Sequence, residues 1–125
     1  MSELNNLNET PDYTEVFNPE DVNSNRAMGI LAYIGLLVLV PLFAAKDSPF
    51  ARFHYNQGLV LAIAEVVATS VFKLLSHLKL IGWIFSLAAW LVGVAAVVLT
   101  ILGIVNAAKG RAKELPVIGS IQLLK

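Results

Sequence analysis

Long uncharged stretches dominate the hydrophobic and polar pattern of this chain. The longest, residues 80–108, has 29 residues without a charged side chain, and residues 27–45 form a second uncharged run of 19. A third apolar stretch, 58–75, contains Glu65 and Lys73 as its charged residues. Because about 20 helical residues cross a hydrocarbon core of about 30 Å, the pattern predicts three transmembrane helices, over 27–45, 58–75 and 80–108.

Local signals refine the ends of these helices. Ser48 followed by Pro49 is typical of a helix start, with serine as N-cap and proline in the first turn. We therefore expect the second helix to begin near residue 48, ahead of its apolar part. The 80–108 helix would reach about 43 Å, so it must tilt or project from the core. Residues 115–125 are apolar but too short to cross, and we expect them at the membrane surface.

The first 25 residues have a different composition from the rest. They are rich in Asn and contain six acids, two prolines and no Lys or Arg. Such a segment has too little apolar surface to order itself, and it has neither the basic start nor the apolar core of a signal peptide. We expect residues 1–25 to be a disordered acidic tail before a single membrane domain, 26–125.

Composition supports the membrane interpretation. Hydrophobic residues make up 57% of the chain and charged residues 14%, against about 25% charged in soluble domains. A formal net charge of zero gives no reason to expect nucleic acid as a partner, and the lack of cysteine excludes disulfides and thiolate sites. The expected fold is all-α: a three-helix transmembrane bundle with a disordered acidic N-terminal tail, in contact with the lipid bilayer.

Small residues recur along the third predicted span in steps that alternate between four and three, so they share one helix face. Such residues let helix backbones approach closely in lipid. We therefore expect this face to pack against another helix, either from the same chain or from a second copy or another membrane protein. The stripe consists of Gly82, Ser86, Ala89, Gly93, Ala96, Thr100, Gly103 and Ala107.

Among the polar side chains within the predicted spans, three are candidates for a specific role: Glu65, Thr69 and Asn106. A charge at mid-membrane costs about 2.5–3.5 kcal/mol on insertion scales, so Glu65 should face protein or water, or be protonated. Glu65 is then either a structural hydrogen-bonding group or part of a proton or ion path. Asn106 is expected to hydrogen-bond across helices or at the helix end.

The opening turns of the second helix contain a polar cluster: Arg52, His54, Asn56 and Gln57. These residues suit the headgroup layer as helix-capping groups, and Arg52 with Asn56 could alternatively clamp a lipid phosphate. His54 and His77 lie at opposite ends of one predicted helix, so the sequence indicates no metal site. It also shows no serine–histidine–acid set, no glycine-rich phosphate loop and no paired carboxylates, so we expect no enzymatic activity and no cofactor.

The basic residues suggest an orientation. With three spans, Arg26, Lys73 and Lys79 would share the side of the N-terminus, and six bases would lie on the side of the C-terminus. The positive-inside rule then predicts an external N-terminus and a cytoplasmic C-terminus. The six bases are Lys46, Arg52, Lys109, Arg111, Lys113 and Lys125.

Two blocks of the sequence resemble motifs of small bacterial membrane proteins of unknown function. The first is AAKDSPFARFHYNQGL over 44–59, and the second is GIVNAAKG over 103–110 followed by ELPVIG over 114–119. The resemblance covers about residues 26–125. The family is distantly similar to the small membrane subunit of the chloroplast inner-envelope protein-import translocon and also resembles magnetosome-membrane proteins.

The resemblance implies a helical bundle in a bacterial cytoplasmic membrane that acts by association rather than by chemistry. The translocon relatives usually have four spans, so their import function is not transferred to this chain. Our leading functional interpretation is a non-enzymatic scaffold or accessory subunit acting through helix contacts. The alternatives are a small transporter or channel component that uses Glu65, and a lipid-headgroup binder that uses Arg52. The resemblance adds weight to five positions: Arg52, His54, Asn56, Gln57 and Asn106.

Overall fold

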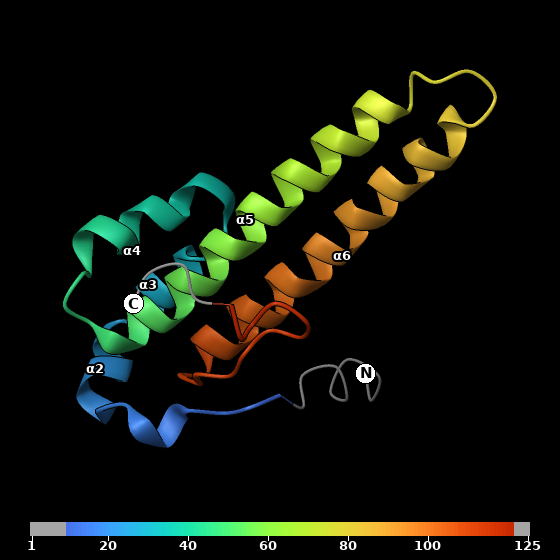
Figure 1. The fold of residues 1–125 in the computed structure, drawn as a ribbon. Coiled ribbons are helices and arrows are strands. Elements are labelled where there is room, and N and C mark those ends of the chain that lie inside the picture. Colours follow the sequence, from blue (N-terminus) through green and yellow to red (C-terminus); the bar gives the residue numbers. More distant parts are fainter. Residues whose placement is uncertain (1–9, 122–125) are drawn as a thin grey trace.

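The computed structural model describes residues 10–121, and this part of the chain is helical without a β-strand. Five α-helices and two short 3-10 helices follow one another along the chain (Figure 1). The expected all-α class is therefore confirmed. The elements are η1 (Thr14–Val16), α2 (Pro19–Ser24), α3 (Arg26–Leu31), η2 (Gly35–Val38), α4 (Leu39–Ala44), α5 (Pro49–Leu75) and α6 (Gly82–Ala108).

Helices α5 and α6 form a long antiparallel hairpin that makes up the length of the molecule (Figure 1). Each has 27 residues and is therefore about 40 Å long. Both are long and apolar enough to cross a membrane. Helix α5 begins at Pro49, where the Ser48 side chain accepts a hydrogen bond of 3.1 Å from the Ala51 N–H, which satisfies one of the free donors at a helix start.

The three-span bundle is not confirmed, because residues 27–45 do not form one helix. This stretch is divided among α3, η2 and α4. The chain leaves α3 through a turn and reaches Gly35 with a φ of +51°, a conformation that glycine adopts at little cost. As a result α3 packs mainly against α6, and α4 returns alongside α5.

Two glycines allow the α3 end to approach the hairpin closely. A Cβ added to Gly58 of α5 would lie 1.7 Å from the carbonyl oxygen of Ala32, and one added to Gly103 of α6 would lie 2.4 Å from the Tyr33 ring. The turn after α3 is therefore pressed between both long helices. The buried core around it includes Ala32, Tyr33, Val38, Tyr55, Leu61, Leu102 and Leu115.

Residues 10–25, which we expected to be disordered, are ordered against the rest of the chain. Phe17 packs edge-on against Phe50 and Phe53, and the N–H of Tyr13 donates to the carbonyl of Ala112 at 2.8 Å. Aromatic burial and backbone pairing therefore offset the polar composition of this segment. Residues 1–9 of the expected tail lie outside the described residues.

The pairing of the two terminal segments bears on the predicted orientation. Besides the Tyr13 contact, the N–H of Glu114 donates to the carbonyl of Pro11 at 3.0 Å, and Asp12 and Lys113 form an isolated antiparallel bridge. Segments in backbone contact must lie on the same side of a membrane. The prediction of an external N-terminus and a cytoplasmic C-terminus is therefore not supported.

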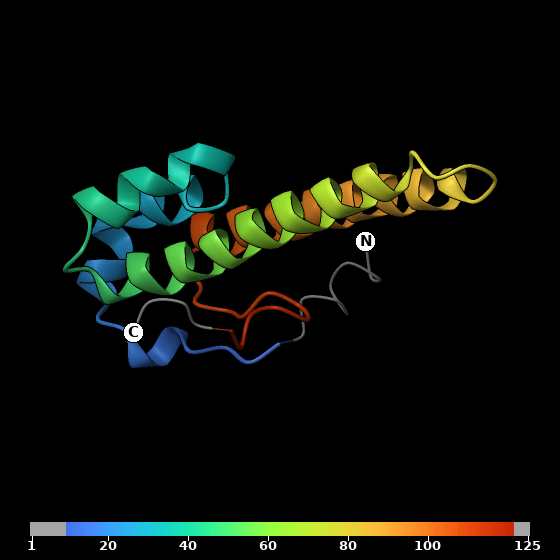
Figure 2. The ribbon, with the colours of Figure 1, turned by 45° about the horizontal axis from the view of Figure 1, so that its top comes forward.

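The two ends of the hairpin differ in width. We call the end with α2, α3, α4 and the two terminal segments the base, and the 76–81 connection the tip. The C-terminal segment reaches along the hairpin to where Ile121 borders Val67 and Ala68 of α5. Figure 2 shows α3 and α4 on one side of the hairpin and the terminal segments on the other, while the tip half extends beyond α3 and α4. Exposed apolar side chains cover this outer half, including Val66, Val71, Leu74, Trp83, Ile84, Leu87, Trp90 and Leu91.

The close approach at Gly58 generates a test of the base. Gly58→Ala places a methyl group against the Ala32 carbonyl, so the backbones must separate, and we expect a loss of about 1–3 kcal/mol of stability. Gly93→Ala is the matched control, because no atom lies within 4 Å of its added Cβ and alanine favours the helix. Thermal unfolding in detergent measures both variants; equal stability of the two would contradict the packing at Gly58.

Candidate functional site at the base of the hairpin

A chain of buried polar groups crosses the base from α5 to the end of α3. The Gln57 side-chain amide donates to the Tyr33 hydroxyl at 2.6 Å, and that hydroxyl lies 2.6 Å from Nδ1 of His54. All three side chains are buried. Because an unpaired polar group in such a place is costly, these contacts hold the three residues in one arrangement.

The same residues bind the C-terminal segment through its backbone. Nε2 of His54 donates to the carbonyl of Arg111 at 2.8 Å, and the Gln57 amide donates to the carbonyl of Lys113 at 3.3 Å. In return, the Leu115 N–H donates to Oε1 of Gln57 at 2.5 Å. These partners assign His54 as the neutral tautomer with its proton on Nε2, accepting the Tyr33 proton at Nδ1.

Every donor and acceptor of this cluster is engaged. Both ring nitrogens of His54 have partners, and the Gln57 amide uses its two protons and its oxygen. No buried side-chain nitrogen or oxygen among residues 10–121 lacks a hydrogen-bond partner. The arrangement therefore positions chain segments and leaves no lone pair of His54 for a metal or a substrate.

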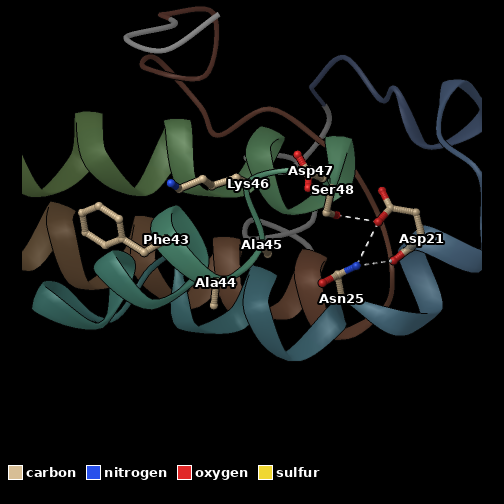
Figure 3. Close-up of a pocket in the computed structure, with 8 residues that line it drawn as sticks. All are labelled: Asp21, Asn25, Phe43, Ala44, Ala45, Lys46, Asp47 and Ser48. Atoms are coloured by element: carbon tan, nitrogen blue, oxygen red, sulfur yellow. Dashed lines mark hydrogen bonds between the residues drawn. The ribbon is translucent and has the colours of Figure 1, made fainter.

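A second polar cluster ties α2 to the start of α5 (Figure 3). One oxygen of Asp21 accepts from the Ser48 hydroxyl at 2.5 Å and from the Asn25 amide at 2.9 Å, and the other accepts from the Phe50 N–H at 3.0 Å. Asp21 and Ser48 thus cap α5 together. The cluster borders an open cavity of about 410 Å³ that also reaches Lys46.

The structure separates the four predicted interfacial residues. His54 and Gln57 belong to the buried cluster, and Asn56 is also buried. Arg52 is exposed on α5, so it does not share the buried surroundings of Asn56. Asn106 is fully buried near the end of α6, where its backbone carbonyl accepts from the Arg111 N–H at 2.8 Å.

The small-residue stripe of α6 is covered at the base and more open toward the middle. Ala96, Gly103 and Ala107 are buried, whereas Ser86 is exposed, and a Cβ on Gly93 would meet nothing within 4 Å. The chain's own helices therefore use the base part of the stripe. Of the other members, Gly82 is buried and Ala89 and Thr100 are half-buried.

Glu65 does not support a transport path. Glu65 is exposed on α5 and borders an open depression of about 490 Å³ together with Trp90 and Gly93 of α6. Thr69, one turn further, is half-buried. The carboxyl group thus lies on the outer surface of the hairpin rather than inside an enclosed channel.

Asp12 and Thr14 form a small polar cluster at the edge of the base, outside the long helices. The Thr14 N–H donates to Asp12 at 2.9 Å. Partial burial raises the pKa of Asp12, but the side-chain and backbone hydrogen bonds from Thr14, together with the charges of Lys113 and Arg111, lower this pKa overall. Across the residues that the structure describes, no group of three or more His, Cys, Asp or Glu is placed to hold a metal ion.

Two residues of the site were missed by sequence reasoning. Tyr33 was counted as an apolar member of the first span, although a tyrosine hydroxyl needs a partner when buried. Asp21 lay within the expected tail, where Asn18-Pro19-Glu20-Asp21 is itself a helix-start pattern: the Asn18 side chain accepts from the Glu20 N–H at 2.9 Å. That pattern was the available signal.

The contacts of His54 predict that its side chain protects the C-terminal segment from proteolysis. His54→Ala removes one bond to the Arg111 carbonyl and one to Tyr33, at a cost of about 1–3 kcal/mol. We expect trypsin to cleave after Arg111 and Lys113 faster than in the unaltered chain, as followed by mass spectrometry. His77→Ala, at the exposed tip, should leave the cleavage rate unchanged; equal rates in the two variants would refute the assignment.

Comparison with known proteins places this architecture in a family. The chain is 38% identical over 93 residues to the magnetosome protein MamF of Paramagnetospirillum magneticum, covering 74% of this chain and 77% of the relative. It is 36% identical over 92 residues to the magnetosome protein MmsF of the same bacterium, covering 73% and 78%. MamF of Magnetospirillum gryphiswaldense is 34% identical over 94 residues, covering 74% and 78%. No solved structure matches.

The expected resemblance to magnetosome-membrane proteins is thus confirmed, and the distant similarity to the chloroplast translocon is not shown. The expectation of a family of unknown function was wrong, since the matching family model is described by its role in magnetite crystal formation. That model covers residues 24–124, which include both long helices and the polar cluster. The chain belongs to the MamF/MmsF family, the magnetosome magnetite crystal formation proteins.

Proposed function

We propose that this chain is a non-enzymatic scaffold or accessory protein of magnetite crystal formation, embedded in the magnetosome membrane. Family membership supports the process. The scaffold role is supported by what the buried polar side chains of the base bind. His54 and Gln57 are fully engaged in holding the chain's own segments, so they support assembly of the protein rather than chemistry on a substrate.

In this proposal α5 and α6 cross the bilayer as a hairpin. The exposed apolar surface of their outer half, with Trp83 and Trp90, suits lipid contact. The backbone pairing of the terminal segments supports two crossings rather than three. The base then lies at one face of the membrane, and the 76–81 connection emerges at the other.

The distribution of bases supports a cytoplasmic base. Of the nine Lys and Arg residues, two, Lys73 and Lys79, are next to the tip, and the others precede or follow the hairpin or lie in its first turn. The positive-inside rule assigns the richer side to the cytoplasm. Both terminal segments are then cytoplasmic, and the tip faces the opposite compartment.

This orientation can be measured with single cysteines, since the chain has none of its own. We expect an impermeant thiol reagent, applied to intact cells of a heterologous bacterial host, to label Leu80→Cys at the exposed tip. Glu15→Cys and Arg111→Cys, both exposed at the base, should react only after permeabilisation. Labelling of the two base positions on opposite sides of the membrane would refute the hairpin.

The positions of carboxylates also favour a scaffold over an iron-binding surface at the tip. Imidazole and carboxylate groups are ligands for iron, but the 76–81 connection has no Asp or Glu and a single histidine, His77. The acids of the base are occupied in part by capping, as at Asp21. We therefore assign the tip no role in binding iron.

The open part of the α6 stripe is the surface on which we expect a second membrane helix to pack. Gly93 has free space above it, and small residues at such positions permit close backbone approach in lipid. Ser86, two turns toward the tip, is exposed on the same face. The partner would be another copy or another protein of the magnetosome membrane.

Gene replacement in a magnetite-forming host tests the proposal. Deletion should change the size or number of crystals seen by electron microscopy, and the unaltered chain should restore them. Gly93→Leu fills the open face and should fail to restore them at a normal membrane level of protein. Leu91→Phe, at an exposed position of α6 outside that depression, is the matched control and should succeed. Unchanged crystals after deletion would refute the function; full rescue by Gly93→Leu would refute this contact surface.

A further inference from the structure

The cross-section of the molecule changes along the hairpin. At the base, α3 and α4 lie on one side of α5 and α6 and the terminal segments on the other (Figure 2). Four residues separate the end of α4 from the start of α5, and Val38 lies level with Gly58. Because Gly58 is about 14 Å from the start of a helix of about 40 Å, α3 and α4 add width over roughly the first third of α5. The C-terminal segment adds less width but reaches further, to where Ile121 borders Ala68.

The outer surface of α4 continues the apolar surface of the hairpin. Leu36 is 84% exposed and Phe43 is 66% exposed, and the apolar helical stretch Gly35–Ala44 is about 15 Å long, too short to cross a membrane. Lys46 and Asp47 follow it directly and mark where this surface meets water. Other exposed apolar residues of this stretch are Leu37, Leu39 and Val40.

A helix of this kind occupies the boundary between headgroups and acyl chains of one leaflet. On the proposed placement of the hairpin, the leaflet at the base must accommodate α3 and α4 as well as α5 and α6. The opposite leaflet accommodates the two long helices and the part of the C-terminal segment that borders Val67 and Ala68. The protein therefore takes up more area in one leaflet than in the other.

We propose that this chain is a membrane wedge that binds preferentially to bilayers curved so that the base lies in the convex leaflet. Lipids in a convex leaflet are spread apart, so inserting the wide base there relieves packing defects, whereas a flat or concave leaflet must be compressed. The partner is a lipid surface of defined curvature. With the base in the cytoplasm, the favoured membrane is one that bulges toward the cytoplasm.

The test uses the full chain reconstituted into giant phospholipid vesicles, from which narrow tubules are pulled. The chain inserts into vesicles in both orientations, and labelling with an impermeant dye after reconstitution distinguishes the two populations. Arg111→Cys, at the base, reports molecules whose base faces outward, and Leu80→Cys, at the tip, reports the opposite insertion. Because the outer leaflet of a tubule is convex, base-labelled molecules should be enriched in tubules over the flat vesicle at least about twofold.

Tip-labelled molecules provide an internal control of opposite sign, because their base lies in the concave leaflet. They should be depleted in the tubules. Equal partition of the two labelled populations, or enrichment of the tip-labelled one, would overturn the wedge. This comparison needs no change in the packed parts of the protein, so it decides the question even where further variants fail to fold.

A variant links the effect to α4. Leu36→Ser with Phe43→Ser removes exposed apolar groups and should abolish the enrichment while circular dichroism stays unchanged. Leu78→Ser with Leu80→Ser, an exposed apolar pair at the tip, should retain it. The proposal rests on the proposed hairpin placement, which the cysteine-labelling experiment tests separately. Equal partition with the expected labelling pattern would therefore refute the wedge and leave the scaffold function standing.

Discussion

Irregular backbone beside a bilayer is stable where its N–H and C=O groups find partners within the protein. Residues 111–115 follow α6 without helical structure, and their carbonyl and amide groups are bound by His54 and Gln57. Both side chains project from the first turns of α5 and reach Tyr33 as well. The arrangement of the base therefore follows from the need to provide hydrogen-bond partners for the backbone of residues 111–115.

Several other features depend on this contact. The C-terminal segment, once fixed, offers its backbone to residues 11–13, which orders the N-terminal segment and brings both to one side of the membrane. Tyr33 reaches the polar cluster because Gly58 and Gly103 leave room for the turn after α3. Helices α3 and α4 are thereby confined to the base, which is the source of the uneven width of the molecule.

The sequence predicted the all-α class and long apolar helices well, because composition and run length depend directly on the bilayer. It did not reveal that the chain reverses within 27–45. An uninterrupted apolar run has the same hydrophobic pattern whether the chain continues as one helix or turns at Gly35. The order of the N-terminal segment was hidden by its average composition, which masked Phe17 and Asp21. The polar motif at 52–57 was identified from the sequence. Its burial was not predicted, because the segment that covers it, residues 111–115, lies more than fifty residues away in the chain.

The mode of attachment at residues 111–115 also affects how sequences in this family can diverge. His54 and Gln57 contact backbone atoms of Arg111, Lys113 and Leu115, and the Arg111 residue is exposed. Exchanging a side chain at that position leaves the peptide groups available to the same donors and acceptors. The surface that carries the terminal segments can therefore acquire a different charge pattern by substitution while the hydrogen bonds to its backbone are retained.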